Sequence, residues 1–349
     1  MALPTRVLTA DRGDEGLRLD LVLRRHLTDL RRATRTRVQT WIEQGLVTVN
    51  GAPVRRVSTR AALGDIVAVM LPDEPPRAVM VAEDVRLDVL YEDDSLLAIN
   101  KPAGVVVHPT YRNTTGTAMN ALLWHARAWP APQRPSLVSR LDKLTSGIIV
   151  VAKTAAAHGA LQRAMAASFP ASAGGFAEAE PSKDYLAVVY GRVKLARGEI
   201  DLRLGRDERD RRKVVASATV GAESLTRFER LSSVKAPRAG LSLLRCRLAT
   251  GRTHQIRVHL SARGWPLVGD PVYGEPKWTA IEDPLLAATL RGFPRQALHA
   301  WRVAFTHPVT RARLVIEAPV PRDLEDLLEA AGLSFSRVQK DPACLPAER

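Results

Sequence analysis

The stretch VSRLDKLTSGIIVV, residues 138–151, places one acidic residue, Asp142, between basic neighbours at the start of a wholly apolar run. Residues 148–152 have the composition of a buried strand, and the glycine before them marks its beginning. A loop held on such a strand can position a catalytic carboxylate. The alternative is that Asp142 makes only a surface ion pair with Arg140 or Lys143.

The length and charge of the chain restrict its partners. At 349 residues, 46% of them hydrophobic, the chain is long enough for one large domain and one small one. The formal net charge of +14 favours a polyanionic partner, because lysines and arginines displace the counterions condensed on phosphates. Nucleic acid is the leading candidate, and a basic protein of the membrane surface is the alternative. No stretch approaches the ~20 apolar residues that span a bilayer.

The N-terminus and the cysteines predict a cytoplasmic protein. Residues 1–20 have mixed charge and no apolar core, unlike a secretory signal. The cysteines, Cys246 and Cys344, suit a reducing compartment and indicate neither a disulfide framework nor a zinc site. We therefore expect the protein to stay in the cytoplasm.

The N-terminal segment predicts a small domain of two helices and short strands. Apolar residues recur at helical spacing over residues 19–27. A second helix is expected to begin at Thr36, which can cap it, and to end near Gly45. A strand then ends in the Asn50–Gly51 pair that tight hairpins favour.

Arginines dominate the surface expected for this domain. Within the run one acid, Asp29, accompanies them, whereas ordinary solvated faces mix both signs. The segments RLDLVLRRHL, TRTRVQTWIEQGLVTVNG and LGDIVAVMLP occur in this order, and with them residues 17–72 resemble an S4 RNA-binding domain. In that family the two-helix face binds structured RNA. The resemblance implies RNA contacts from Arg24, Arg25, Arg31, Arg32, Arg35 and Arg37, and a merely solvated surface is the alternative.

A polar, proline-rich segment separates this small domain from a larger one. We expect an S4-like domain at 1–72, a linker at 73–84, a catalytic domain at 85–331 and a loosely ordered tail at 332–349. Strand patterns dominate the larger domain without the regular helix alternation of a doubly wound sheet. The predicted fold class is therefore α+β: a small S4 domain of the αL type, then a domain with a mostly antiparallel mixed sheet flanked by helices.

Several shorter segments of the larger domain also have an expected structure. Residues 105–107 are expected to form a strand, and 205–216 a solvated hairpin with RNA contact as the alternative. The segments 166–182 and 274–296 lack a clean period. We expect both to be surface excursions that contribute little to the core.

Four motifs follow one another along residues 85–320: YEDDSLLAINKPAGVVVHPT, VSRLDKLTSGIIVVAKT, KDYLAVVYG and CRLATGRTHQIRVHLSARGWPLVGDPVYG. In this order they resemble the RluA family of pseudouridine synthases. The S4-like domain and the VVHPT turn are most similar to its RluC- and RluD-like members, which modify large-subunit ribosomal RNA. The chain departs from the family at Ser139, where members often have a histidine. The Arg, Asp, Thr, Ser and Gly positions of that motif are intact.

The resemblance implies that Asp142 is the central catalytic residue. Pseudouridylation detaches uracil from ribose and reattaches it through carbon, so a carboxylate must act beside the sugar, either attacking C1′ or removing a ribose proton. Arg257 is the expected ion-pair partner that orients Asp142, and Arg252 is the second candidate. The alternative for either arginine is phosphate binding or a helix-end charge.

Further residues are expected around the target base. Tyr185 matches the family's aromatic residue that packs on the base and assists proton removal at C5, and an ordinary strand tyrosine is the alternative. Ile256 would form an apolar wall. Because the uridine must leave its stack, Arg140 is expected to fill the vacated space or brace the backbone, unless it pairs with a neighbouring acid. Lys143 is expected to bind substrate as well.

No cofactor or metal is expected. The sequence has no HExxH, CxxC, GxxxxGK[ST] or GxGxxG motif, and His254 and His259 do not have the spacing of a helical metal pair. We expect a monomer that binds ribosomal RNA, with transfer RNA as the alternative and with no membrane or nucleotide cofactor. A non-catalytic ribosome-assembly factor and a nucleoside hydrolase are the other classes, and the hydrolase would need a second acid that no motif supplies.

Overall fold

The computed structural model describes residues 4–30, 33–72, 80–110, 113–166, 181–210, 213–235, 240–274 and 277–335. The chain divides into two compact units, Met1–Val79 and Met80–Arg349. Most of the predicted linker 73–84, of the predicted tail 332–349 and of the segment 166–182 lies outside the described residues. None of the helices in the described ranges is long and apolar enough to cross a membrane.

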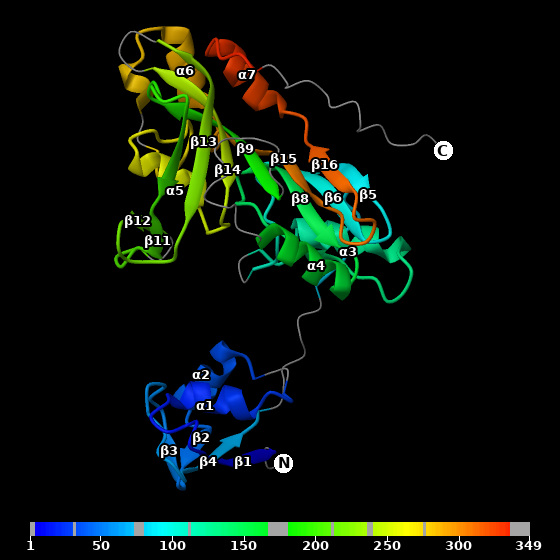
Figure 1. The fold of residues 1–349 in the computed structure, drawn as a ribbon, viewed down its shortest axis with the longest axis vertical. Coiled ribbons are helices and arrows are strands. Elements are labelled where there is room, and N and C mark those ends of the chain that lie inside the picture. Colours follow the sequence, from blue (N-terminus) through cyan, green and yellow to red (C-terminus); the bar gives the residue numbers. More distant parts are fainter. Residues whose placement is uncertain are drawn as a thin grey trace. The chain divides into compact units, whose positions relative to one another are not determined.

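The N-terminal unit packs two helices on an antiparallel sheet (Figure 1). In chain order its elements are β1 (Thr5–Thr9), α1 (Leu19–His26), α2 (Arg35–Glu43), β2 (Val47–Val49), β3 (Ala52–Val54) and β4 (Ile66–Met70). The strands lie in the order β1-β4-β2-β3. Leu19 and Leu23 of α1 and Val38 and Ile42 of α2 are buried against Val67 of β4, as their helical spacing predicts.

Of two local predictions for this unit, one is wrong and one is confirmed. Thr36 was wrong as the helix cap, because the extended backbone ends at Thr34 and Thr36 already lies inside α2. The predicted hairpin is confirmed: Asn50 and Gly51 both have positive φ, 50° and 81°, and join β2 to β3. Positive φ at both central residues matches the turn that an Asn-Gly pair favours.

A large sheet organises the second unit (Figure 1). Its strands are β5 (Val89–Glu92), β6 (Leu96–Lys101), β7 (Ser136–Leu137), β8 (Ser146–Ala152), β9 (Ser182–Tyr190), β10 (Arg197–Asp201), β13 (Leu225–Val234), β14 (Leu241–Leu248), β15 (Leu298–Thr306) and β16 (Arg313–Glu317). The order is β10-β13-β14-β9-β15-β8-β6-β5, with β16 beside β15 and β7 beside β8. Among the described strands only the β15–β8 pairing is parallel, which confirms the mostly antiparallel mixed sheet.

Helices cover both faces of this sheet. They are α3 (Ala118–His125), α4 (Ala155–Ala166), α5 (Gln255–Ala262), α6 (Pro284–Gly292) and α7 (Arg322–Ala330), with short 3₁₀ turns η1 (Ala126–Ala128) and η2 (Lys277–Ala280). The hairpin of β11 (Arg203–Arg206) and β12 (Val214–Ser217) stands apart from the sheet. The antiparallel pairing of these two strands confirms the hairpin expected at 205–216.

The apolar run after Asp142 is buried on both sides. Ile148 and Val150 of β8 pack in one cluster with α4, whereas Ile149 and Val151 pack in another with α3. Successive side chains of a strand point to opposite faces, so a strand covered on both faces needs a continuous apolar run. This burial makes β8 a rigid support for the loop that precedes it.

Two expectations for this unit are wrong. Residues 105–107 form no strand, because carbonyl groups there accept hydrogen bonds from the first turn of α3. The segment 274–296 does contribute to the core: it contains α6, whose Leu286 and Leu290 are buried with α7 and β9. The helix was missed although Asp283 caps it and a proline follows at its first position.

Gly147 fixes the place where β8 begins. β15 runs parallel to β8 there, with Ala300 opposite Gly147. Gly147 has a φ of 112°, and a Cβ atom at this position would collide with the backbone of Ala300. The neighbouring Ser146 hydroxyl and the Nδ1 atom of His299 are 2.9 Å apart. The end of the Asp142 loop is therefore fastened to a central strand of the sheet.

We expect Gly147→Ala to lower the free energy of unfolding of this unit by about 3 kcal/mol or more, since it adds backbone strain and overpacking together. Gly264→Ala is the matched control: Gly264 has a φ of 77°, but nothing lies within 4 Å of its added Cβ. Urea denaturation of the full-length variants measures both. Equal destabilisation by the two substitutions would show that the close approach to Ala300 has no energetic importance.

Candidate active site

The loop between β7 and β8 carries Asp142, and several backbone contacts hold this loop. The Thr145 amide donates to the Asp142 carbonyl at 3.1 Å. The carbonyl of Lys143 accepts both the Gly104 amide, at 2.9 Å, and the buried ammonium of Lys101, at 3.1 Å. Burial and the charge of Arg295 lower the pKa of Lys101 to about 7. The loop is thereby tied to the turn after β6.

Ser139, which replaces the histidine common in the related family, has a structural contact. Its hydroxyl accepts a hydrogen bond from the Val150 amide at 3.3 Å. The serine therefore links the start of the loop to β8.

Arg257 lies between two carboxylates. Its Nη1 donates to Oδ2 of Asp142 at 3.0 Å, while Nε and Nη2 form a two-pronged pair with Asp270 at 2.7 and 2.9 Å. The pairing of Asp142 with Arg257 agrees with the sequence prediction, and neither Arg140 nor Lys143 forms the surface ion pair that was its alternative. The Asp142 side chain is 26% exposed and that of Asp270 only 1%, so Asp142 is the carboxylate that a substrate can reach.

The electrostatics of this group are dominated by the buried pair. Burial alone would lower the pKa of Arg257, but hydrogen bonds and charge from Asp270 and Asp142 outweigh it and raise the pKa. Burial likewise opposes ionisation of Asp270, yet Arg257 and the amides of Val272 and Tyr273 hold the pKa of Asp270 below its usual value. Arg257 is thus a permanent cation with one fixed and one accessible anion.

Asp270 was not singled out from the sequence. It lies in the string GDPVYG at the end of the fourth motif, but its role depends on a contact across thirteen positions with Arg257. These thirteen positions include most of α5 and the turn that follows it, and no local sequence pattern indicates a contact over that separation. A lone acid after a glycine was indistinguishable from an ordinary turn residue.

A pocket of about 250 Å³ opens beside Asp142. Tyr185 of β9, Ile256 of α5 and Leu298 of β15 line its apolar side, and Arg257 lines its charged side. Burial, reinforced by the negative charge of Asp142, raises the pKa of Tyr185 above its usual value, so its hydroxyl keeps its proton at neutral pH. A flat aromatic ring and an isoleucine can enclose a planar base next to the carboxylate.

His254 is a second residue of the site that the sequence did not identify. It precedes α5 with a left-handed backbone, φ 56°, and its Nδ1 is 2.8 Å from the Tyr273 hydroxyl. Its Nε2 is 3.9 Å from Oδ2 of Asp142. Burial lowers the pKa of His254, so it is mainly neutral at pH 7. The histidine therefore lines the pocket without neutralising Asp142.

The other predicted substrate residues surround the pocket at different distances from Asp142. Arg140 is exposed and donates to the Thr253 hydroxyl at 3.1 Å, which connects the rims on either side of the pocket. Arg252 donates to the backbone carbonyl of Glu223 at 3.3 Å, so the second candidate for pairing with Asp142 is turned elsewhere. Lys143 lines an adjoining, larger hollow with the VVHPT turn.

Carboxylates neutralise part of the arginine charge in the N-terminal unit. Arg24 is exposed, Arg37 is partly exposed, and Arg35 lies 3.9 Å from the carboxylate of Asp20. Asp20 is buried and also accepts from Arg18. An acid outside residues 24–37, where the sequence has only Asp29, thus lies close to these arginines. Arg31 and Arg32 lie outside the described residues.

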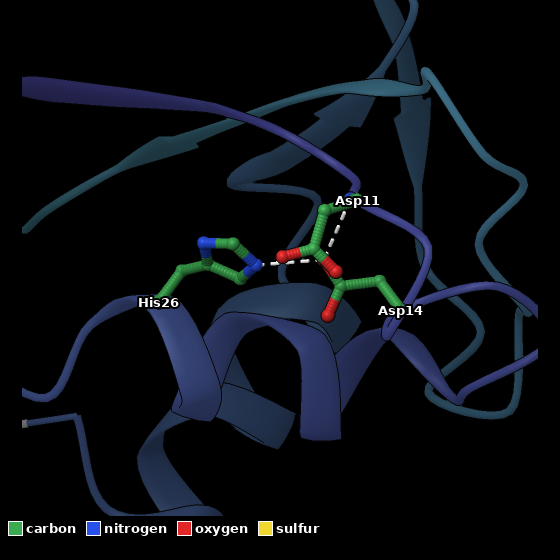
Figure 2. A group of neighbouring side chains, drawn as sticks. All are labelled: Asp11, Asp14 and His26. Atoms are coloured by element: carbon green, nitrogen blue, oxygen red, sulfur yellow. Dashed lines mark hydrogen bonds and ion pairs between the residues drawn. The ribbon is translucent and has the colours of Figure 1, made fainter.

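Arg25 belongs to a compact network with Asp11, Asp14 and His26, of which Figure 2 shows the two carboxylates and the imidazole. Its Nη1 donates to Asp11 at 2.7 Å and to Asp14 at 2.8 Å, while His26 Nε2 lies 2.7 Å from the second oxygen of Asp14. The three groups have the residue types of a metal site, but the guanidinium already occupies their oxygens. A cation there would be repelled by Arg25, so we assign the cluster to ion pairing.

Comparisons with known proteins identify the family of the chain. A family model described as RNA pseudouridylate synthase matches residues 95–262, and an S4 domain model matches residues 17–67. The chain is 38% identical over 325 residues to the ribosomal large subunit pseudouridine synthase D of Neisseria meningitidis serogroup B, covering 92% of this chain and 81% of that one. It is 40% identical over 328 residues to the protein of that name from Xylella fastidiosa, covering 93% and 92%.

A solved structure has the same fold. Human RNA Pseudouridylate Synthase Domain Containing 1 matches 71% of this chain and 89% of its own, with a TM-score of 0.51 and 25% identity. The chain belongs to the RNA pseudouridine synthase family, with an S4 domain in its N-terminal unit. It is an RNA-modifying isomerase, as the motifs predicted.

We expect Asp270→Asn to destabilise the larger unit by about 3 kcal/mol at pH 7, because it leaves Arg257 with a single, partly exposed anion. The pKa of Asp270 is lowered in the folded state, so its stabilisation is present at neutral pH and is lost as the pH falls through that value. The difference from the wild type should therefore shrink in acid. Urea denaturation at several pH values measures it.

Asp326→Asn is the control, since Asp326 forms an exposed pair with Arg322 that should contribute less than about 1 kcal/mol. A pH-independent difference between the wild type and Asp270→Asn would contradict the assigned ionisation of Asp270.

Proposed function

We propose that this protein isomerises specific uridines of large-subunit ribosomal RNA to pseudouridine, with Asp142 as the catalytic nucleophile or base. The observation that carries the proposal is the accessible Asp142 carboxylate, oriented by Arg257 and facing a pocket of about 250 Å³ that Tyr185 also lines. The substrate class rests on relatives named ribosomal large subunit pseudouridine synthase D. Transfer RNA is the alternative substrate within the same family.

The residues that line the pocket would have different roles in the reaction. A carboxylate held at 3.0 Å by a cation can attack C1′ or take a ribose proton once the uridine is in place. Tyr185 and Ile256 would enclose the base while it is detached and turned. Exclusion of water by these apolar walls favours reattachment through carbon over loss of free uracil.

Entry of the base requires extrusion from its stack, which costs a few kcal/mol, least for a base already in a loop. Arg140 and Lys143 are placed at the rim, where they can contact the RNA that remains outside. Arg140 must release Thr253 to fill a vacated stack. We assign these two residues and Arg252 to RNA positioning.

The N-terminal S4 unit is proposed to supply affinity and site choice. Arg24, Arg35 and Arg37 are assigned to phosphate contacts, and Arg25, which binds Asp11 and Asp14, is assigned to shaping the loop before α1. We further propose that the protein acts as a cytoplasmic monomer. A purely non-catalytic assembly factor would need none of the geometry around Asp142.

Asp142→Asn should abolish pseudouridine formation while the protein stays folded and still binds RNA, because the substitution keeps the shape but removes the ionised oxygen. Tritium release from C5-labelled uridine, in ribosomal RNA and in parallel in transfer RNA, measures the activity and identifies the substrate. Asp94→Asn, an exposed change of the same kind, should have wild-type activity. Activity of Asp142→Asn within tenfold of the wild type, about 1.4 kcal/mol in barrier, would exclude an essential role.

Two substitutions at Tyr185 separate stacking from proton transfer. Tyr185→Phe keeps the ring and removes the hydroxyl, whereas Tyr185→Leu removes both. We expect Tyr185→Leu to lose at least a hundredfold in kcat, since the base loses its aromatic wall. The Phe variant reports the hydroxyl alone, and the same tritium assay measures each rate. Wild-type rates for both variants would make Tyr185 an ordinary residue of the core.

A further inference from the structure

Lys183 is a basic residue of the site region for which the proposed chemistry has no use. It lies on β9 two positions before Tyr185, so both side chains point to the same face of the sheet. The residue between them, Asp184, points to the opposite face, where it is buried and binds Arg247 at 2.6 Å. The neighbouring carboxylate is therefore committed elsewhere and does not neutralise Lys183.

Lys183 is half-buried, and its ammonium group has no compensating anion among the described residues. Burial lowers its pKa, and no neighbouring charge contributes to that shift. Among the described residues it makes no hydrogen bond or ion pair, although it lines the same pocket as Asp142. A cation taken out of water without an anion is costly, so such a position favours a ligand that supplies negative charge.

A groove continues from the pocket at this lysine. The groove has a volume of about 800 Å³ and runs between α4 and the ends of β9 and β14. It shares Lys183, Leu248 and Arg252 with the pocket, and Arg163 of α4 lies farther along it. Neither Arg163 nor Arg252, both exposed, pairs with a carboxylate in the described part of the chain. Three cations thus follow one hollow that opens into the catalytic pocket.

We propose that Lys183 binds a backbone phosphate adjacent to the target uridine, and that the RNA strand leaves the pocket along the groove past Arg252 and Arg163. Lys183 is then a positioning residue: its contact forms only when the uridine is inserted, and it fixes the ribose relative to Asp142. An ammonium on a flexible stem suits a phosphate oxygen, which needs no planar, two-pronged partner. The proposal rests on the proposed function, because it takes RNA as the substrate.

The test removes the charge of Lys183 by substitution and the charge of single phosphates by chemical modification of the RNA, first separately and then together. The probe is a short RNA that the full-length wild-type protein converts to pseudouridine, made with one methylphosphonate at each linkage flanking the target in turn. The wild-type protein should lose about tenfold in kcat/KM at one flanking linkage. Lys183→Gln should lose about tenfold on the unmodified RNA, mainly in KM, and should lose nothing further at that same linkage.

Matched variants separate this contact from general effects. Lys194→Gln removes an exposed lysine of the same unit that lines neither hollow, and should behave as the wild type. Lys183→Arg should restore most of the affinity. Each phosphate contact removed should also flatten the plot of log affinity against log salt by roughly 0.7, for Lys183→Gln and Arg163→Gln alike.

Conversion of the probe by the wild-type protein tests the catalytic function separately from this contact. An equal methylphosphonate penalty in the wild type and in Lys183→Gln at every linkage would overturn the proposal. So would a salt slope that Lys183→Gln leaves unchanged. Loss of activity in Lys183→Gln with an unchanged KM and a lowered melting temperature would show instead that the lysine is only structural.

Discussion

The active site depends on the ion pairs that Arg257 forms with Asp142 and Asp270. A buried guanidinium is tolerated only where anions surround it, and Asp270 meets this need with two hydrogen bonds, at 2.7 and 2.9 Å. The amides of Val272 and Tyr273 in turn fix Asp270. The remaining nitrogen donates to Asp142, so a buried ion pair orients the accessible carboxylate toward the pocket.

The sheet provides the other half of this constraint. Asp142 precedes a strand that is buried on both faces, and the close approach of Gly147 to Ala300 fixes the start of that strand. Lys101 holds the loop from the other side through the Lys143 carbonyl. The arginine and the aspartate therefore meet because α5 and β8 are both anchored to one sheet, although 115 positions separate them in the chain.

Sequence patterns predicted the parts of this site that short motifs encode. Asp142, Arg257 and Tyr185 lie in strings with recognisable neighbours, and the apolar run after Asp142 correctly indicated a buried strand. Asp270 and Lys183 were not identified, because their significance depends on partners that are distant in sequence or missing. The same limit explains the acids that neutralise Arg25, since long-range ion pairs have no local signature. Helix α6 is different: Asp283 and the proline after it mark its start locally, but its apolar residues show no clean period.

A double-mutant cycle between Arg257 and Asp270 shows how far the active site depends on this buried ion pair. If Asp270 acts on catalysis only by holding Arg257, the losses from Arg257→Met and Asp270→Asn should not add. The measurement is kcat/KM for pseudouridine formation by both single variants and the double variant. The double variant is expected to be no slower than Arg257→Met alone. A loss in the double variant equal to the product of the two single losses would contradict it.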